Sequence, residues 1–428
     1  MCPRGDDESG VSMTDDHATQ GAITRMERNI RLYPWYAAFF NAFFWMPVFF
    51  LYFGAHLPLS RVLQLEGVYY AAVVLLEVPS GYFSDRVGRR TTLLTSSVLL
   101  IAAYLLFFFG AGFAAFALAQ VLLAAGIAFN SGTDTSFHYD SLATLGRAVE
   151  YEEREAIVAR NSLVATGAAA LLGGAVASVD LSYAYGASAL TAVVALGLVF
   201  SFAEPEHREA EASDFVHQIA HCLAHLKQPQ LAWLFGFAVL AVVINHVPYE
   251  FYQPYLDVLG TQVGLGEHTA LAAGAHMAVA TLIGAWFARR SARIDKRLGT
   301  GRTLLLAAVI QLAIIGSMAL VLHAAVVVLI LLRGVPSGLY KAPLNAAVTP
   351  RIPQEERATY LSIQSLAGRL GFTGLLAGLS LVAGDAGVDH WPVLSELLVV
   401  AVVVGGAGWL VLAGLLPLVE LNGKRTQN

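Results

Sequence analysis

Charged residues are scarce in this sequence. Asp, Glu, Lys and Arg together make up 13% of the 428 residues, whereas a soluble domain usually carries about 25%. Hydrophobic residues make up 57% of the chain. This composition is typical of a membrane protein, and it leaves little chain for a soluble domain.

Two further absences exclude whole classes of protein. The chain has only two cysteines, Cys2 and Cys222, both in polar segments, so no disulfide framework is indicated. It contains no G-x-x-x-x-G-K-[ST] loop for nucleotide phosphates, which argues against a primary pump. No nucleophile–base arrangement and no nucleic-acid patch stands out. We therefore expect no enzyme, no cofactor and no nucleic-acid partner.

Long apolar segments divide the chain instead. A membrane-spanning helix needs roughly 20 apolar residues, and the first such segment starts past residue 30, which argues against a cleavable signal peptide. Residues 1–24 are polar, and we expect an unstructured tail there. The candidate spans are 32–55, 62–83, 91–111, 113–138, 156–178, 182–203, 229–258, 269–288, 303–322, 324–348, 357–383 and 393–419.

These spans predict an all-α, polytopic membrane protein made of two six-helix bundles. The expected parts are a tail (1–30), a first bundle (31–203), a polar linker (204–228), a second bundle (229–420) and a second tail (421–428).

The basic residues orient the chain. With both ends in the cytoplasm, the inner segments hold 22 of the 26 Lys and Arg residues, and only Arg61 lies in an outer loop. Cytoplasmic loops are the ones enriched in Lys and Arg. We therefore expect a multi-pass protein of the plasma membrane (a bacterial inner membrane) with both termini cytoplasmic. Nothing in the sequence signals an oligomer, so a monomer is the expectation.

The loop between the second and third spans carries the most distinctive motif. Its carboxylate can accept charge-assisted hydrogen bonds and its arginines can donate them from a fixed fork, so the loop can act as a latch between helices. The spacing G-x-x-x-D-R-x-G-R-R resembles the loop between helices 2 and 3 of the major facilitator superfamily, a large family of secondary transporters. The matching residues are Gly81, Asp85, Arg86, Gly88, Arg89 and Arg90.

This loop and a second motif recur further along the chain. Residues 85–91 reappear as 295–303, so Asp295 and Arg297 are expected in a second latch, and residues 152–163 reappear as 355–366. Two echoes in the same order, on either side of the linker, indicate two related halves. In the architecture that the resemblance implies, the substrate site lies near the membrane midplane between halves that rock to expose it alternately.

Ionisable residues within the spans are functional candidates, because a charge inside a bilayer is costly. Glu77 lies about 12 Å and Arg369 about 18 Å from the cytoplasmic surface, at 1.5 Å per residue. In the family that the chain resembles, the second and eleventh helices face each other across the halves. A Glu77–Arg369 pair could therefore lock the closed state and break on protonation; pairing within one half is the alternative.

The inner part of the fourth span is also polar. Asp140 is near enough to the surface to pair with Arg89 or Arg86, as an acidic residue does in the family's latch. Asp134 and His138 are four residues apart and so share a helix face. They form either a proton site, since imidazole titrates near neutrality, or a satisfied polar pair.

The tenth span carries two cations. Arg333 and Lys341 are eight residues apart and fall within about 80° of one another on a helix. We expect them either to draw an anionic group into a cavity or to pair with Glu77, Glu250 or Asp134.

The chain departs from the family's pattern at two places. The family often has an arginine early in its fourth helix, tied to proton coupling, where this chain has Gln120. Exporters of the family commonly show G-x-x-x-G-P-x-x-G-G in the fifth helix. Residues 167–174 keep the final pair of glycines but lack the proline, and small residues here also allow close helix packing.

Two stretches are candidates for lining a substrate cavity. Residues 245–253 are polar and aromatic, and Pro248 should break or kink the helix there; an ordinary bend near a helix end is the alternative. The first span is rich in aromatics, which either form a wall for an amphiphilic substrate or face lipid. The candidate lining residues are Asn41, Trp45, Asn245, Tyr249 and Glu250.

The linker places His217, His221 and His225 four residues apart, with Cys222 beside them. Three imidazoles on one helix face can bind zinc or copper, but such a run is more often the surface of an amphipathic helix. We predict no metal site.

These features predict secondary active transport of a small organic molecule by alternating access, driven by a gradient of protons or of substrate. Proton-coupled export of an amphiphilic or drug-like compound is the first hypothesis. Uptake of a metabolite by a symporter or facilitator is the second. The alternative from another class is a membrane receptor or scaffold that does not transport, and the presence of Asp85 together with Arg89 argues against it.

Overall fold

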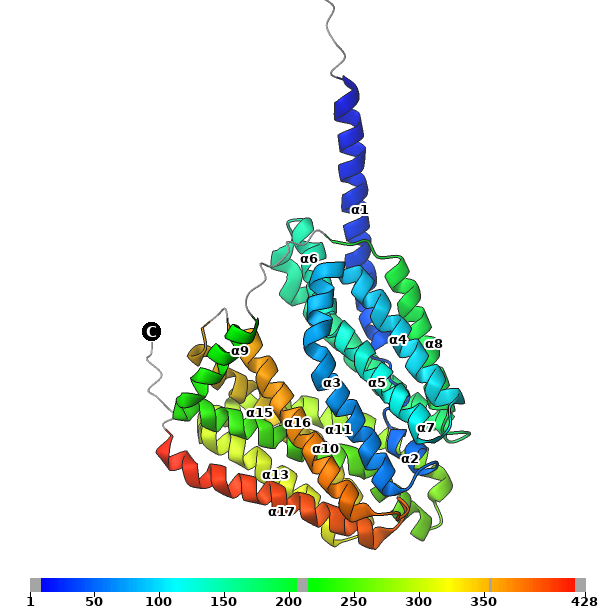
Figure 1. The fold of residues 1–428 in the computed structure, drawn as a ribbon, viewed down its shortest axis with the longest axis vertical. Coiled ribbons are helices and arrows are strands. Elements are labelled where there is room, and N and C mark those ends of the chain that lie inside the picture. Colours follow the sequence, from blue (N-terminus) through cyan, green and yellow to red (C-terminus); the bar gives the residue numbers. More distant parts are fainter. Residues whose placement is uncertain (1–8, 206–214, 354–355, 420–428) are drawn as a thin grey trace, which may run out of the picture.

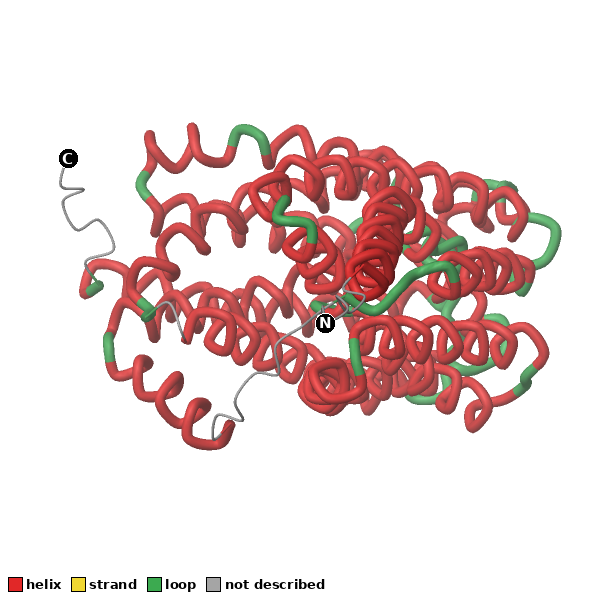
Figure 2. Tube along the Cα trace, turned by 90° about the horizontal axis from the view of Figure 1, so that it is seen from above, coloured by secondary structure: helices red, strands yellow, loops and turns green. Residues whose placement is uncertain are grey.

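The computed structural model describes residues 9–205, 215–353 and 356–419. Within these ranges the chain forms two groups of helices (Figure 1) and no strand. Eleven helical segments of the described chain are long and apolar enough to cross a membrane. The predicted all-α, polytopic fold is confirmed, and Figure 2 shows the same bundle from above.

The first group, which we call the N-half, is built from the apolar runs of residues 9–200. Glycine directly follows two of these helices, Gly88 after Val87 and Gly110 after Phe109. The helices are α1 (Ser9–Phe40), α2 (Phe49–Gly54), α3 (Leu59–Val87), α4 (Arg89–Phe109), α5 (Gly112–Asn130), α6 (Thr133–Thr144), α7 (Tyr151–Ala177) and α8 (Tyr183–Phe200).

The second group, the C-half, follows the short linker helix α9 (Phe215–Ala224). The helices are α10 (Pro229–Gln262), α11 (Thr269–Ala288), α12 (Ser291–Leu298), α13 (Thr300–Leu320), α14 (Ala324–Ile330), α15 (Gly334–Val348), α16 (Arg357–Ala383) and α17 (Trp391–Leu415).

The prediction of one continuous first span over 32–55 is wrong, because residues 41–48 interrupt the helix between α1 and α2. The freed backbone groups find side-chain partners: Thr166 donates to the Asn41 carbonyl (3.0 Å), and the Phe44 N–H donates to Ser188 (3.1 Å). Irregular backbone at membrane depth persists where it is buried in protein or lines a cavity.

The expected unstructured tail over 1–24 is also wrong from Ser9 onward, because α1 begins there and projects beyond the bundle (Figure 1). Extending an existing helix adds one hydrogen bond per residue ordered and needs no new nucleus. Residues 1–8, including Cys2 and Arg4, lie outside the described chain, as do 206–214, 354–355 and 420–428.

Pro248 does not break α10, which runs unbroken from Pro229 to Gln262. Proline lacks an N–H, so the carbonyl of Ile244, four residues earlier, loses its helical donor. The side-chain amide of Gln311 on α13 donates to that carbonyl instead (3.4 Å).

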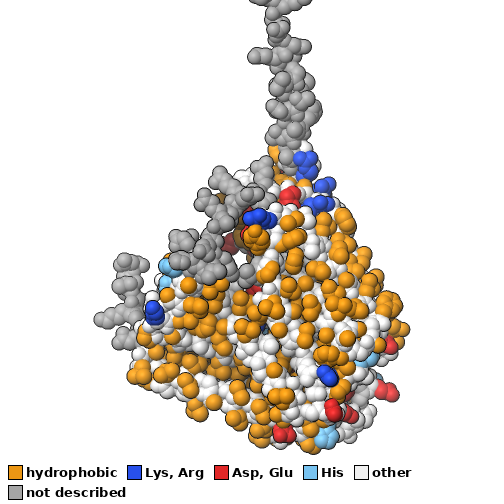
Figure 3. Space-filling model, viewed as in Figure 1, with side chains coloured by type: hydrophobic (Ala, Val, Ile, Leu, Met, Phe, Trp, Pro, Cys, Tyr) orange, Lys and Arg blue, Asp and Glu red, His pale blue; other side chains and the backbone are white. Residues whose placement is uncertain are grey.

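The molecule has two ends, to which we give names. The basic face, rich in Lys and Arg, is the end where α1 leaves the bundle and where α3 meets α4. The opposite face is the end that holds α2 and residues 384–390. Figure 3 shows apolar side chains over the drawn surface, Lys and Arg gathered near the exit of α1, and acidic and His side chains at the other end. A band of apolar side chains between charged ends suits a protein that spans a bilayer.

The two halves meet chiefly along α3 with α16 and α7 with α11, and α2 also contacts α10. Between described residues, the hydrogen bonds and ion pairs that join the halves run from the opposite face, where the Leu59 N–H donates to Ala386 (2.9 Å), to Glu77 and Arg369 near mid-height. From Glu77 to the end of α3 the described chain shows none. The halves are therefore joined at the opposite face and apart at the basic face.

Candidate substrate cavity and latch

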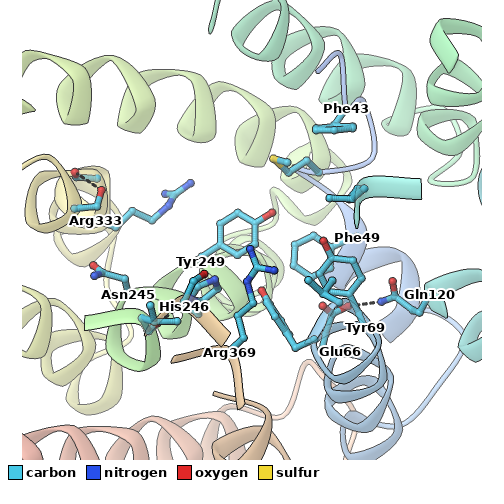
Figure 4. Close-up of a pocket in the computed structure, with 18 of the residues that line it drawn as sticks. Phe43, Phe49, Glu66, Tyr69, Gln120, Asn245, His246, Tyr249, Arg333 and Arg369 are labelled. Carbon is cyan, nitrogen blue, oxygen red and sulfur yellow. Dashed lines mark hydrogen bonds between the residues drawn. The ribbon is translucent and has the colours of Figure 1, made fainter. Parts of the chain in front are cut away.

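A cavity of about 620 Å³ lies between the two halves (Figure 4). Residues of α3, α5, α10, α15, α16 and the interrupted segment 41–48 line it. Figure 4 shows Arg333 and Asn245 on one side of the cavity and Phe49, Tyr69 and Glu66 on the other, with Arg369 and Tyr249 between them. The two sides therefore differ in chemistry.

The side of the cavity formed by the N-half is aromatic. Phe43, Trp45 and Phe49 reach it because the break in the first span turns these side chains inward. Trp45 stacks on Tyr185 at 6.3 Å between ring centroids, and Phe49 stacks on Tyr249 of the C-half at 5.7 Å. Stacked rings are held rigidly, so they form a preshaped apolar wall.

The side formed by the C-half carries cations. Arg333 lies in the single 3₁₀ turn (Leu331–Arg333) that joins α14 to α15. Its guanidinium lies over the ring of Tyr252 (3.9 Å to the centroid) and 2.5 Å from Nδ1 of His276. Lys341 also lines the cavity, and no described residue lies within hydrogen-bond or ion-pair distance of it.

Glu77 and Arg369 form an ion pair across the halves, with 2.9 Å between Oε2 and Nη1. Arg369 lines the cavity from α16, and its partner Glu77 lies on α3. The pair is the last bond between the halves before α3 and α16 separate toward the basic face. The sequence allowed Glu77 to pair either with Arg369 or with a residue of its own half, and the structure contains the pair with Arg369.

Two buried carboxyl groups lie beside the cavity without a cation. Gln120 donates to Glu66 (3.0 Å), and Tyr70 donates to Glu250 (3.0 Å). Glu66 and Tyr70 are four residues apart on α3, so they share a helix face. Oε2 of Glu250 is buried and lacks a hydrogen-bond partner among the described residues.

Three of the five predicted lining residues, Trp45, Asn245 and Tyr249, do line the cavity. Two do not, and these predictions are wrong. Asn41 hydrogen-bonds to the Ala37 carbonyl (2.8 Å) behind the break, and Glu250 is fully buried beneath the lining. The helix period alone could not place them, because the first span is not one helix and the side chain of Glu250 turns toward α3.

Glu66 was missed as a candidate, although it obeys the same rule as Glu77. It is an ionisable residue in an apolar segment, but it lies close to the start of the predicted span 62–83. A position near a span end is typical of an interfacial residue, whereas α3 begins at Leu59 and carries Glu66 into the protein, where it is 5% exposed.

The expected latch is present at the basic end of the N-half. Nη1 of Arg89 lies 2.6 Å from Asp85 and 2.9 Å from the hydroxyl of Ser84, and its Nε lies 3.4 Å from Asp140 on α6. Of the two arginines proposed for Asp140, the structure brings Arg89 to it. One side chain therefore ties together the end of α3, the start of α4 and α6.

Glu204, at the end of the N-half, completes this loop and was not predicted. Its two carboxylate oxygens accept the N–H groups of Arg89 (2.6 Å) and Arg90 (2.9 Å), the first two residues of α4. A carboxylate at a helix start satisfies orphan donors and opposes the positive end of the helix dipole. Gly88 has φ +104°, and a Cβ there would lie 2.9 Å from this carboxylate, so the turn needs glycine.

The side chains of Arg86 and Arg90 take no part in these bonds. The guanidinium of Arg86 lies over the ring of Tyr82 (5.0 Å), and Nη2 of Arg90 donates to the Phe200 carbonyl (3.3 Å). A side chain at Gly81 would meet no atom within 4 Å, so close packing does not account for a glycine there.

The prediction of a second latch from Asp295 and Arg297 is wrong: no described residue forms an ion pair with either. Gly299 has φ +82° and ends α12 as Gly88 ends α3. The residue after this glycine, which is Arg89 in the N-half, is Thr300 in the C-half. Arg297 stands two residues after Asp295, and side chains at that spacing do not face each other on a helix.

Asp134 and His138 have separate partners instead of pairing with each other. Asp134 accepts hydrogen bonds from Asn130 (3.1 Å) and from the Thr135 N–H (2.8 Å). Nδ1 of His138 lies 2.5 Å from Glu155 on α7. Both groups lie inside the N-half, away from the cavity, and neither pairs with Arg333 or Lys341.

In the linker, Nε2 of His225 lies 2.5 Å from the carboxylate of Glu356, which directly precedes α16, and Cys222 lies against the Glu356 carbonyl. Burial, and secondly the nearby carboxylate, raise the pKa of the Cys222 thiol. The side chain of His217 lies outside the described structure. Within the described chain, no group of three His, Cys, Asp or Glu residues could hold a metal.

Comparisons with known proteins agree with this geometry. A profile of the Major Facilitator Superfamily matches residues 35–375. None of the curated proteins compared with the chain matches it.

Solved transporter structures have the same fold. A crystal structure titled nucleoside transporter NupG matches with a TM-score of 0.72 at 13% identity, covering 90% of this chain and 99% of that one. An inward-facing, unoccupied bacterial homologue of the lysosomal transporter Spinster matches at 0.68 and 15% identity, covering 92% and 97%. An inward-facing bacterial homologue of the iron transporter ferroportin matches at 0.66 and 17%, covering 90% and 98%. At these identities the likeness concerns the fold alone.

Proposed function

The chain belongs to the Major Facilitator Superfamily, and we propose that it is a secondary active transporter that moves a small organic molecule by alternating access. One observation carries the proposal. The cavity lies between halves whose described residues are bonded to each other from the Glu77–Arg369 pair to the opposite face, and not toward the basic face. A transporter in which two halves rock around a central site passes through such a state.

We take the basic face to be cytoplasmic, as the distribution of Lys and Arg favours. The structure then corresponds to the state in which a substrate enters from, or leaves to, the cytoplasm. In this state the Glu77–Arg369 pair holds α3 against α16 while the outer face is closed. Breaking this pair is one step toward the other state.

Glu66 and Glu250 support coupling to protons. Each is buried and bonded to a neutral side chain, Gln120 or Tyr70, and no described Lys or Arg forms an ion pair with either. Ionising both carboxylates in such surroundings would cost free energy, and a charged substrate in the cavity would change that cost. Proton binding and substrate binding are therefore linked. Gln120, at the place where the family often has an arginine, leaves Glu66 without a fixed counter-charge.

The lining of the cavity supports export of an amphiphilic compound, which is our first hypothesis for what is transported and in which direction. The wall of Phe43, Trp45 and Phe49 offers apolar surface to a substrate that would also partition into a membrane. Uptake of a metabolite uses the same alternation in the other direction.

Inverted membrane vesicles, whose cytoplasmic face is outward, test both points. We expect an inside-acid gradient to drive accumulation of aromatic amphiphiles by the wild-type protein. Glu66→Gln should lose this accumulation and keep exchange of substrate without a gradient, because the cavity remains but the proton site is gone. Glu267→Gln, an exposed carboxylate on the opposite face, is the matched control.

Accumulation that does not respond to the gradient would contradict proton coupling. Accumulation driven by an inside-alkaline gradient would favour uptake by symport instead.

A further inference from the structure

We infer that the substrate of the cavity is an organic anion with an aromatic body, whose acid group binds at Arg333 and Lys341 and whose ring lies on the wall of Phe43, Trp45 and Phe49. The inference rests on the proposed transport function and names its substrate class. It follows from the distribution of charge around the cavity.

Arg333 is held in place by neutral partners. Nε2 of His276 lies 3.0 Å from the Val327 carbonyl, which can only accept, so this nitrogen carries the ring proton. Nδ1 of the same ring is then free to accept from Arg333, 2.5 Å away, and the imidazole is uncharged. The other contact of Arg333 is the ring face of Tyr252, 3.9 Å from the guanidinium. The side chain is therefore oriented while its charge is not neutralised.

The cavity lining contains two further cations, Arg369 and Lys341, and within the described chain only Arg369 is paired with a carboxylate. Arg369 is already paired with Glu77 (2.9 Å). Lys341 is exposed, lines the cavity and has no hydrogen-bond or ion-pair partner among the described residues. Arg333 and Lys341, both from the segment 331–348, are thus the two cations of the lining without a counter-charge.

The two buried carboxyl groups beside the cavity do not supply that counter-charge. Glu66 lies across the cavity from Arg333 (Figure 4) and is bonded to Gln120. Glu250 is fully buried and directed at Tyr70. An arginine has five N–H donors in a fixed fork, of which His276 takes one, so a carboxylate, sulfonate or phosphate can bind the rest.

The aromatic wall indicates that the rest of the substrate, to which the anionic group is attached, is aromatic. Phe43, Trp45 and Phe49 face the cavity opposite the cations, and Phe49 is stacked on Tyr249 across the halves. A flat ring can lie against such a wall, whereas a small inorganic anion would leave it in contact with water. A cationic amphiphile would bring a like charge to Arg333 and Lys341. The anionic aromatic class uses both sides of the cavity.

Three probes with the same ring system separate these possibilities: 2-naphthoate, the neutral 2-naphthamide and the cationic 2-naphthylmethylamine. We expect 2-naphthoate to bind the purified full-length protein at least tenfold more tightly than either of the others, measured by calorimetry or by ligand-induced thermal stabilisation. Benzoate, with a smaller ring, should bind more weakly than 2-naphthoate, and inorganic phosphate more weakly still.

Arg333→Gln and Lys341→Gln should each weaken 2-naphthoate binding at least tenfold and leave 2-naphthamide binding within about twofold. Arg302→Gln, an exposed cation outside the cavity in the same half, is the control and should change neither. The amide probe shows that each variant is folded and keeps its aromatic wall. Equal affinity for the three probes, preference for the amine, or unchanged 2-naphthoate binding in both variants would overturn the inference.

The inference and the proposed function fail in different ways. Selective binding of 2-naphthoate with no flux into proteoliposomes would support the anion site and contradict transport of this class. Flux of the amine or the amide in preference to the acid would support transport and contradict the anion site.

Discussion

The two halves of this protein follow one plan of helices and carry different chemistry. At the cavity, the N-half supplies rings and Glu66, and the C-half supplies Arg333 and Lys341. At the basic face, the N-half has the Arg89 latch, and the C-half has the same turn without it. The shared plan gives the geometry in which a site forms between the halves. The differing residues decide what each half does there.

The difference at the basic face comes from a single position. Both loops turn on a glycine with positive φ, Gly88 or Gly299, and both start the next helix with the residue that follows. In the N-half that residue is Arg89, and in the C-half it is Thr300. Turn geometry and latch chemistry are thus separable, and only the N-half has both.

The two contact lines between the halves differ as well. Between α3 and α16 the ion pair of Glu77 and Arg369 lies at the end of the contact. Between α7 and α11 the backbones themselves approach, because Gly174 faces Gly274 and the carbonyl of Ala270. Small residues permit this approach in membrane proteins. One contact line can be broken by changing charge, and the other only by changing shape.

The largest effect is expected at the close contact of α7 with α11. In Gly174→Ala the new Cβ would lie 2.6 Å from the Ala270 carbonyl, and backbone cannot rotate aside. We expect a loss of about 1–3 kcal/mol in the free energy of unfolding, measured by thermal or chemical unfolding in detergent.

Gly167→Ala on the same helix is the control, since its Cβ meets no atom within 4 Å. There alanine should leave stability unchanged or raise it by up to about 1 kcal/mol, through helix propensity. Equal effects at the two positions would mean that the halves are not held by this close approach.

The second effect tests whether only one half has a working latch. Arg89→Gln removes the charge that ties Asp85 to Asp140, and we expect the initial rate of 2-naphthoate flux in proteoliposomes to fall about tenfold, which corresponds to about 1.4 kcal/mol. Arg297→Gln should change the rate less than about twofold, because Arg297 has no ion pair among the described residues. Equal losses would show that the C-half loop also acts as a latch, with unfolding curves confirming that both variants fold.

The smallest effect concerns Glu204, which caps α4 in the N-half. Glu204→Ala removes the acceptor of the Arg89 and Arg90 N–H groups. Loss of a helix N-cap costs about 1 kcal/mol, so amide hydrogens at the start of α4 should exchange about fivefold faster. Glu153→Ala, an exposed carboxylate on α7, should leave that exchange unchanged. Unchanged exchange in Glu204→Ala would contradict the cap.

Much of the candidate site follows from local sequence. Asp85 and Arg89 could be placed together because they lie four residues apart at the short loop between two helices, and Asp140 was added because of the resemblance to the family's latch. A charge inside an apolar span is costly and therefore marks a functional candidate, which is how Arg333 and Lys341 could be proposed. Trp45 could be proposed because it lies in an aromatic-rich span. The partners of Arg333 were harder to predict, since nothing in the sequence links His276 or Tyr252 to it.

The hydrophobic pattern could not predict where the helices break and where they continue. A run of apolar residues over 32–55 reads as one helix, yet residues 41–48 leave the helix because Thr166 and Ser188 from other helices satisfy its backbone. Pro248 reads as a break, yet Gln311 repairs it from α13. In both cases the deciding hydrogen bond comes from a residue far along the chain.

The sequence by itself determined the helices, their pairing into two halves and the motif of the first latch, because these depend on apolar run length and on residues close in the chain. Only the tertiary structure decided which charges meet neutral partners and which face is closed. Those outcomes depend on contacts between residues hundreds of positions apart, such as Glu77 with Arg369. The charge left over at Arg333 and Lys341 is a property of the assembled cavity, because the carboxyl groups that could neutralise it, Glu66, Glu77 and Glu250, lie on other helices.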